Sequence, residues 1–199
     1  MSVGPNTETA RDASLADFDR ARTEFEEAVR RAPDAALRHR AAGEDYALGG
    51  LVVHVTQVLD HYTDVLNAIH TADWQSPTAP PSQTSDDDAA LIREGFGGDS
   101  RSDVLARLRD AHSALLDAVR AEPADWFSRQ APVTYSGSSE PYPTSPADIV
   151  GWVRDHYTVI RVASGLTLTA LGLLLFFDLD WWLRVMLNRV LDAVGLGNV

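Results

Sequence analysis

The sequence has 199 residues, with 29 acidic and 17 basic side chains, and its formal net charge at pH 7 is -12. This charge argues against nucleic-acid binding, because phosphate contacts need clustered arginine and lysine. The chain has no cysteine, which excludes disulfides, thiolate metal ligands and cysteine nucleophiles. The N-terminus lacks the charged start and apolar run of a secretory signal, so we expect a cytoplasmic protein.

The first helix is expected to follow a short disordered segment. Residues 1–13 are small and polar and show no periodicity, which is typical of disorder. Ser14, with Asp17 three residues later, predicts a helix start, and Pro33 sets the limit of this helix. Its apolar stripe is formed by Leu15, Phe18, Phe25 and Val29.

The longest amphipathic segment runs from Asp45 to Thr71 and carries His54 at the edge of its apolar face. Gly49 and Gly50 near its start would each cost about 1 kcal/mol inside a helix, so they predict either close packing or space left beside the following residues. The proline-rich and acidic segment 74–88 then predicts a flexible linker.

Two further helices each carry a histidine on the predicted inward stripe. Ser102 is expected to cap a helix that ends near Ala121 and includes His112. We interpret His112 as a buried side chain bonded to a polar neighbour, with a ligand role as the alternative. After a long connection that is expected to cover one end of the fold, Ser145 and Pro146 start a helix that contains His156.

The end of the chain is apolar and then amphipathic. The uncharged run from Val162 to Phe177 is shorter than the ~20 residues of a membrane-spanning helix. Residues 178–199 carry Trp181 and Trp182 beside apolar and arginine residues, a pattern that suits contact with a membrane surface. The competing interpretation is a helix that docks on the rest of the protein or forms a homodimer.

Together these segments predict an all-α protein, a four-helix bundle over residues 14–172 with an additional apolar helical extension over 173–199. Such bundles build metal sites from side chains on facing helices, and imidazole is a common ligand. His61 lies two turns, about 10 Å, along the helix from His54, so these two side chains cannot share one ion.

The segment around Tyr46 and His54, together with SPADIVGWVRDHYTVIRVA around His156, resembles the DinB/YfiT-like superfamily of metal-binding four-helix bundles. The resemblance covers about residues 14–170. It implies one histidine ligand on the second helix, matched by His54, and an H-x-x-x-H pair on the last helix, of which His156 matches one member. The other member would be Ile160 or Trp152, and neither coordinates a metal. His112 and Asp155 are the candidates for a third ligand.

The resemblance also implies chemistry. Members of the superfamily include thiol S-transferases and mycothiol-dependent maleylpyruvate isomerases, so the implied cofactors are a divalent ion such as zinc or nickel and a low-molecular-weight thiol. The expected function is a metal-dependent enzyme of thiol S-transferase or hydrolase type that acts on a small molecule, with an incomplete histidine set. The alternative is a non-catalytic bundle of the same fold that acts through homodimer or membrane contacts.

The membrane hypothesis predicts the effect of a truncation. Deletion of residues 178–199 should move the protein from the membrane fraction of a cell lysate to the supernatant. An unchanged distribution between the two fractions, measured by immunoblot, would contradict membrane contact through this segment.

Overall fold

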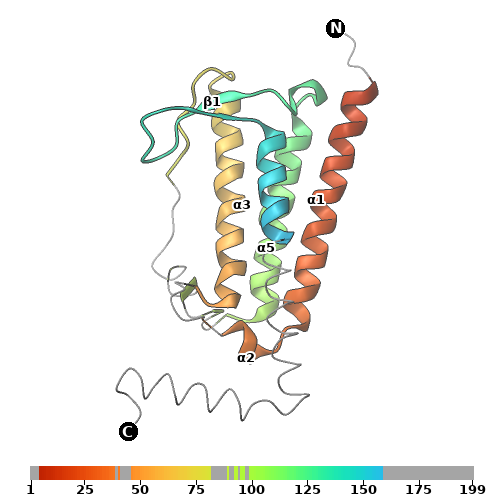
Figure 1. The fold of residues 1–199 in the computed structure, drawn as a ribbon, viewed down its shortest axis with the longest axis vertical. Helices are drawn as coiled ribbons and strands as arrows, with labels where there is room; N and C mark the ends of the chain where they lie inside the picture. The colour runs from red at the N-terminus through yellow and green to blue at the C-terminus, as the bar shows by residue number, and fades with distance from the viewer. Residues whose placement is uncertain are drawn as a thin grey trace, which may run out of the picture. The chain divides into compact units, whose positions relative to one another are not determined.

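A computed structural model of the protein describes residues 5–38, 40, 46–81, 89, 92–93, 95–96 and 99–158. This part is all-α apart from one small hairpin. Its helices are α1 (Pro5–Arg31), α2 (Asp34–Leu37), α3 (Leu48–Thr71), α5 (Arg101–Ala121) and a helix over residues 146–158. The two strands are β1 (Ala131–Val133) and β2 (Tyr142–Thr144). Figure 1 shows the four long helices lying alongside one another.

The predicted helix starts need correction at three places. Helix α1 begins at Pro5 rather than Ser14, so the prediction of disorder over residues 1–13 is wrong from residue 5 onward. Arg11 donates a hydrogen bond of 3.4 Å to the backbone carbonyl of Glu122, which ties this first part of α1 to the end of α5.

The other two starts lie close to their predicted positions. Helix α3 begins at Leu48 rather than Asp45. Helix α5 is capped by Ser100 instead of Ser102, because the Ser100 hydroxyl accepts a hydrogen bond from the backbone N–H of Asp103. The start of the last helix is as predicted, since the Ser145 hydroxyl accepts a hydrogen bond from the backbone N–H of Asp148.

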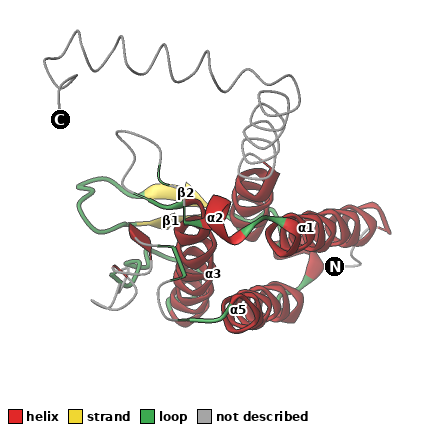
Figure 2. Ribbon diagram, turned by 90° about the horizontal axis from the view of Figure 1, so that it is seen from below, coloured by secondary structure: helices red, strands yellow, loops and turns green. Residues whose placement is uncertain are grey.

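The helix directions follow from contacts at the helix ends. His70 at the end of α3 contacts Glu122 just after α5, so these two helices are parallel. Arg101 at the start of α5 donates to the carbonyls of Val29 and Arg30 at the end of α1, so α1 and α5 are antiparallel. Two parallel neighbours need a connection that returns along the bundle, which explains the long segment between α3 and α5. The view from the α2 end shows α1, α3 and α5 around a common interior (Figure 2).

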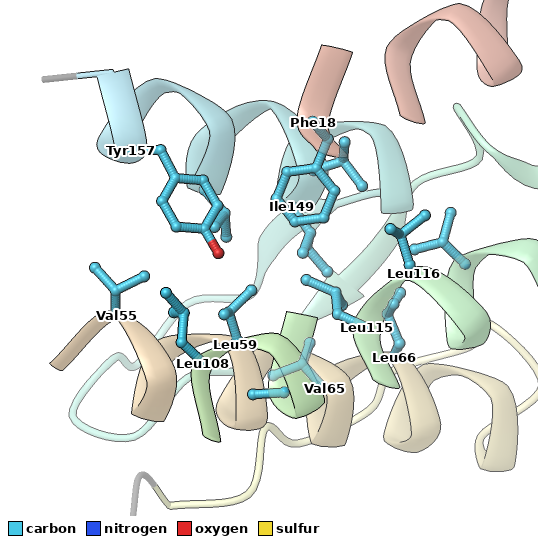
Figure 3. Close-up of a cluster of buried hydrophobic side chains, with 14 of the residues drawn as sticks. Phe18, Val55, Leu59, Val65, Leu66, Leu108, Leu115, Leu116, Ile149 and Tyr157 are labelled. Carbon is cyan, nitrogen blue, oxygen red and sulfur yellow. The ribbon is translucent and has the colours of Figure 1, made fainter. Parts of the chain in front are cut away.

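The core lies where the four long helices meet. Tyr157 of the last helix projects among Phe18 of α1, Leu59 of α3 and Leu108 of α5 (Figure 3), and each of these side chains is at most 1% exposed. Apolar side chains from separate helices thus share one interior, where burial contributes about 25 cal/mol per Å² of apolar surface. The apolar stripe predicted for the first helix is buried: Leu15, Phe18, Phe25, Val29.

The hairpin covers the end of the bundle at which α3 ends. β1 and β2 pair antiparallel, with Val133 opposite Tyr142. The segment after α3 joins them, because Ala79 donates a hydrogen bond of 2.9 Å to the carbonyl of Thr134. The connection 122–145 therefore covers the bundle as predicted, although its strands were not. The predicted linker 74–88 packs in its first part, where Trp74 and Ala79 are buried; residues 82–88 lie outside the described part.

Residues 159–199 lie outside the described part, so the predicted extension over 173–199 and its membrane or dimer contacts stay predictions. Within the described residues, no helix has both the length and the hydropathy that a membrane crossing requires.

The paired glycines of α3 pack closely, which is one of the two arrangements predicted for them. A Cβ atom at Gly50 would collide with the backbone carbonyl of Ile92, whereas one at Gly151 of the last helix meets no atom within 4 Å. We therefore expect Gly50→Ala to lower the free energy of unfolding by at least about 1–3 kcal/mol, the usual cost of overpacking.

Gly151→Ala is the matched control. Alanine is favoured over glycine in a helix interior, so this variant should be stabilised by about 0.5–1 kcal/mol. Urea unfolding followed by circular dichroism measures both changes. Equal stability of the two variants would contradict the close contact between Gly50 and Ile92.

Candidate functional site

His54 lies in the second turn of α3 and is half-buried at the edge of the apolar face, as predicted. Tyr46, which precedes the helix, stacks on it with 5.4 Å between ring centroids. Burial lowers the pKa of His54, and the neighbouring His156 lowers this pKa further. His54 is therefore an uncharged imidazole at neutral pH, and one of its ring nitrogens carries a free lone pair.

His156 is exposed, so the prediction that it points inward is wrong. The residues of this helix that are buried are Pro146, Ile149, Val150, Val153 and Tyr157. The apolar stripe thus passes through Tyr157, which is both aromatic and large, and its neighbour His156 is turned toward solvent.

The His156 ring is nevertheless held in a fixed orientation. It stacks on Trp152 with 3.5 Å between ring centroids, and its Nδ1 lies 2.8 Å from the backbone carbonyl oxygen of Trp152. A carbonyl only accepts, so Nδ1 carries the proton and donates it. The lone pair is then on Nε2, which is the arrangement found in histidines that bind metals.

The charge of His156 lowers the pKa of His54, so the two imidazoles lie within the range of an electrostatic interaction. No third donor joins them in the described part of the chain. Among the described residues, no group of three histidine or acidic side chains has the geometry to hold an ion. Ile160 lies outside the described part, and Trp152 offers an indole ring that stacks instead of coordinating.

His112 lies in a different part of the bundle. It is 1% exposed and packs on Phe18 of α1, with 4.1 Å between ring centroids. Its Nδ1 lies 3.3 Å from the Tyr157 hydroxyl, and its Nε2 is 3.6 Å from Asp19, which is too far for a hydrogen bond. The interpretation of His112 as a buried structural histidine fits these contacts.

Asp155 is also not placed as a third ligand beside the two histidines. It is exposed and forms a 2.9 Å ion pair with the preceding Arg154. Neither candidate for the third position therefore joins His54 and His156 in the described structure.

Aromatic rings connect His156 of the last helix to α3. The Trp152 ring, which stacks on His156, packs edge-on against Tyr62, with 5.4 Å between centroids, and Tyr62 in turn lies 5.6 Å from His61. We call this set the ring strip; its members are His156, Trp152, Tyr62 and His61. Tyr135, next to β1, lies 6.3 Å from His61 by ring centroid.

Sequence reasoning treated these aromatic side chains separately and did not find the strip. One signal was available: Trp152 precedes His156 by four residues, and positions so spaced are neighbours on a helix surface. The contact between Trp152 and Tyr62 joins two helices, so no local pattern indicates it.

Two of the hollows lined by described residues do not include His54 or His156. One has a volume of about 650 Å³ and lies between the last turns of α3 and residues 76–80. Another, of about 260 Å³, lies between α2 and the start of α5. Neither of these two is lined by an imidazole.

The fold and the site together define a class of protein: a four-helix bundle whose second and third long helices are parallel, with two imidazoles contributed by its second and last long helices. Residues 17–158 match the DinB superfamily, and the chain belongs to this family. No curated protein and no solved structure matches the chain. The family membership confirms the resemblance found in the sequence.

Burial of His112 predicts a pH-dependent stability. Burial lowers the pKa of His112 to about 4, and the charges of Arg22 and Arg120 also lower it while Asp19 opposes them. In the unfolded chain a histidine titrates near pH 6.5. As the pH falls below about 6.5, the unfolded chain therefore binds a proton that the folded protein does not bind until about pH 4.

The proton uptake that distinguishes the folded and unfolded forms of His112 therefore leaves the free energy of unfolding unchanged above pH 6.5. Between pH 6.5 and pH 4 it lowers the free energy of unfolding by about 3 kcal/mol in total. Urea unfolding at several pH values measures this decline. His112→Phe keeps a ring at the site but does not titrate, so its stability should decline less over this range; His54 and His61 remain in both proteins. Parallel pH profiles for the variant and the original protein would contradict the prediction.

Proposed function

We propose that this DinB protein binds a divalent transition-metal ion through His54 and His156 and acts as an enzyme of hydrolase or thiol S-transferase type. The observation that carries the proposal is the pair of imidazoles on two helices. His156 donates its Nδ1–H to the Trp152 carbonyl, which leaves Nε2 for a metal. Zinc, nickel and similar ions take such ligands.

The protonation of His54 favours the same role. A histidine must be uncharged to bind a metal, so an imidazole whose pKa is already lowered competes less with protons at neutral pH. Burial is the main cause of this lower pKa, and the nearby His156 adds to it. A metal ion would bind to both histidines in their uncharged forms.

The donor set fits a site with two protein ligands and does not fit the three-ligand site that is usual for catalytic zinc. An ion bound by two imidazoles leaves its other positions to small molecules, water or a low-molecular-weight thiol. When bound, the ion would supply a lower pKa for such a water or thiol, which favours nucleophilic attack on a small-molecule substrate.

The missing donor also favours a second candidate function. In the position four residues before His156, where the family places a ligand, this chain has Trp152, whose ring stacks on His156. A DinB bundle without catalytic activity, which acts through homodimer or membrane contacts, would retain this stacking and have no use for an ion.

Metal retention separates the two candidates. After incubation with zinc or nickel and gel filtration, elemental analysis should find about one ion per chain. His54→Ala and His156→Ala should each weaken retention at least about tenfold, because changes even to groups around a ligand cost 10- to 100-fold. The matched control is His70→Ala, which removes an exposed histidine of α3 that contacts Glu122.

Circular dichroism of each variant verifies that it is folded. If the original protein retains no ion, or if folded His54→Ala and His156→Ala variants retain it as well as His70→Ala does, the metal proposal is wrong and the non-catalytic candidate takes its place.

A further inference from the structure

We propose that the hollow at the end of α3 is a binding site for a small alkylamine, whose ammonium group pairs with the Asp64 carboxylate. The inference goes beyond the proposed function. The hollow is not lined by an imidazole and lies at the end of the bundle that the hairpin covers, so it does not depend on a metal ion.

The size of the hollow and its fixed walls suit a small molecule. Its volume of about 650 Å³ falls within the roughly 300–1,000 Å³ that is usual for ligand sites. One wall is formed by the last turns of α3. The other, residues 76–80, is tied to residue 134 beside β1, because Ala79 donates a 2.9 Å hydrogen bond to the Thr134 carbonyl and Thr134 donates one of 3.0 Å to the Pro77 carbonyl. A ligand therefore meets a surface that is already formed.

The electrostatics of the hollow favour a cation. Of the described residues that line it, Asp64 alone carries a charge, and its carboxylate is exposed without an ion pair to any described arginine. His61, one turn earlier, does not neutralise it, because burial lowers the pKa of His61 although the charge of Asp64 opposes this. The last carbonyl groups of α3 add partial negative charge, which stabilises cations at this end of a helix.

The uncharged polar groups of the lining are sources of oxygen acceptors. They belong to Asn67, Thr71, Ser76 and Thr78. The Thr71 hydroxyl donates a 2.8 Å hydrogen bond to the backbone carbonyl of Asn67, so only its lone pairs remain for a ligand. An ammonium group has three N–H donors and no acceptor, and it therefore matches this set.

The apolar part of the lining distinguishes an alkylamine from an inorganic ion. It consists of Ala68, Ala72, Pro77 and Pro80, whose surface is suited to cover methylene groups. A calcium ion would use none of this surface and needs six to eight oxygen ligands, whereas the hollow offers a single carboxylate.

Three probes of equal length test the proposal: n-butylammonium, n-butanol and butyrate. Each is titrated into the ¹⁵N-labelled full chain, in the presence of a chelator, and binding is followed by the shifts of backbone amide resonances. We expect n-butylammonium to give saturable shifts that centre on residues 64–80. It should bind at least about twofold more tightly than n-butanol, because exposed ion pairs contribute up to about 1 kcal/mol. Butyrate should not shift these resonances.

A matched pair of variants locates the ammonium group. Asp64→Asn should weaken n-butylammonium binding about two- to fivefold, the range expected for an exposed ion pair. Asp117→Asn changes the net charge by the same amount at an exposed site on α5, where Asp117 lies 3.8 Å from Arg120. This control should leave the affinity nearly unchanged. The amide spectrum of each variant verifies that it is folded.

Three results would overturn the inference. One is the absence of saturable shifts in residues 64–80 with n-butylammonium. Another is binding of n-butanol or butyrate that is as tight as that of n-butylammonium. The third is an equal effect of Asp64→Asn and Asp117→Asn, which would identify a general attraction of cations to the negatively charged protein. None of these results bears on metal retention by the two histidines, so the two proposals fail separately.

Discussion

The burial of Tyr157 fixes the rotation of the last helix, and the geometry of the candidate site depends on it. The Tyr157 side chain packs against Phe25 and Phe18, with ring centroids 5.2 and 6.0 Å away, and its hydroxyl lies 3.3 Å from His112. Because neighbouring residues on a helix point about 100° apart, burying Tyr157 turns His156 out of the core. His156 thereby lies exposed at the edge of the bundle, near enough to His54 for its charge to lower the pKa of His54.

The two ends of the bundle have different roles. The hairpin covers the end where α3 finishes and the last helix starts, since the backbone N–H of Ala147 donates to the carbonyl of Phe127. His54 lies near the start of α3 and His156 near the end of the described helix, so the pair is at the other end. A buried polar contact joins α1 and α5: Glu26 of α1 is 4% exposed and accepts a hydrogen bond of 2.7 Å from Arg109 of α5. Leaving such a carboxylate without its partners would be costly, which favours one packing of α1 on α5.

Local patterns predicted the elements well and the orientation of single side chains less well. The apolar periodicity of α3 placed His54 at the edge of the face, and the Ser145–Pro146 start of the last helix was correct. The same kind of periodicity wrongly predicted an inward His156. It depends only on apolar positions three and four residues apart, and it takes no account of Tyr157 being the larger side chain. The strands were missed because each has three residues and contains a proline, and their pairing with each other and with residues 77–79 is non-local.

The sequence by itself determined that the chain is an all-α bundle and that His54 and His156 are the imidazoles to consider, and its resemblance indicated the DinB family. The helices follow from spacing, caps and side-chain chemistry, all of which are local. Only the tertiary structure decided that His112 is buried, that Trp152 stacks on His156, and that Trp152 contacts Tyr62 of another helix. Each of these depends on how the helices rotate against one another, which packing of the whole core determines.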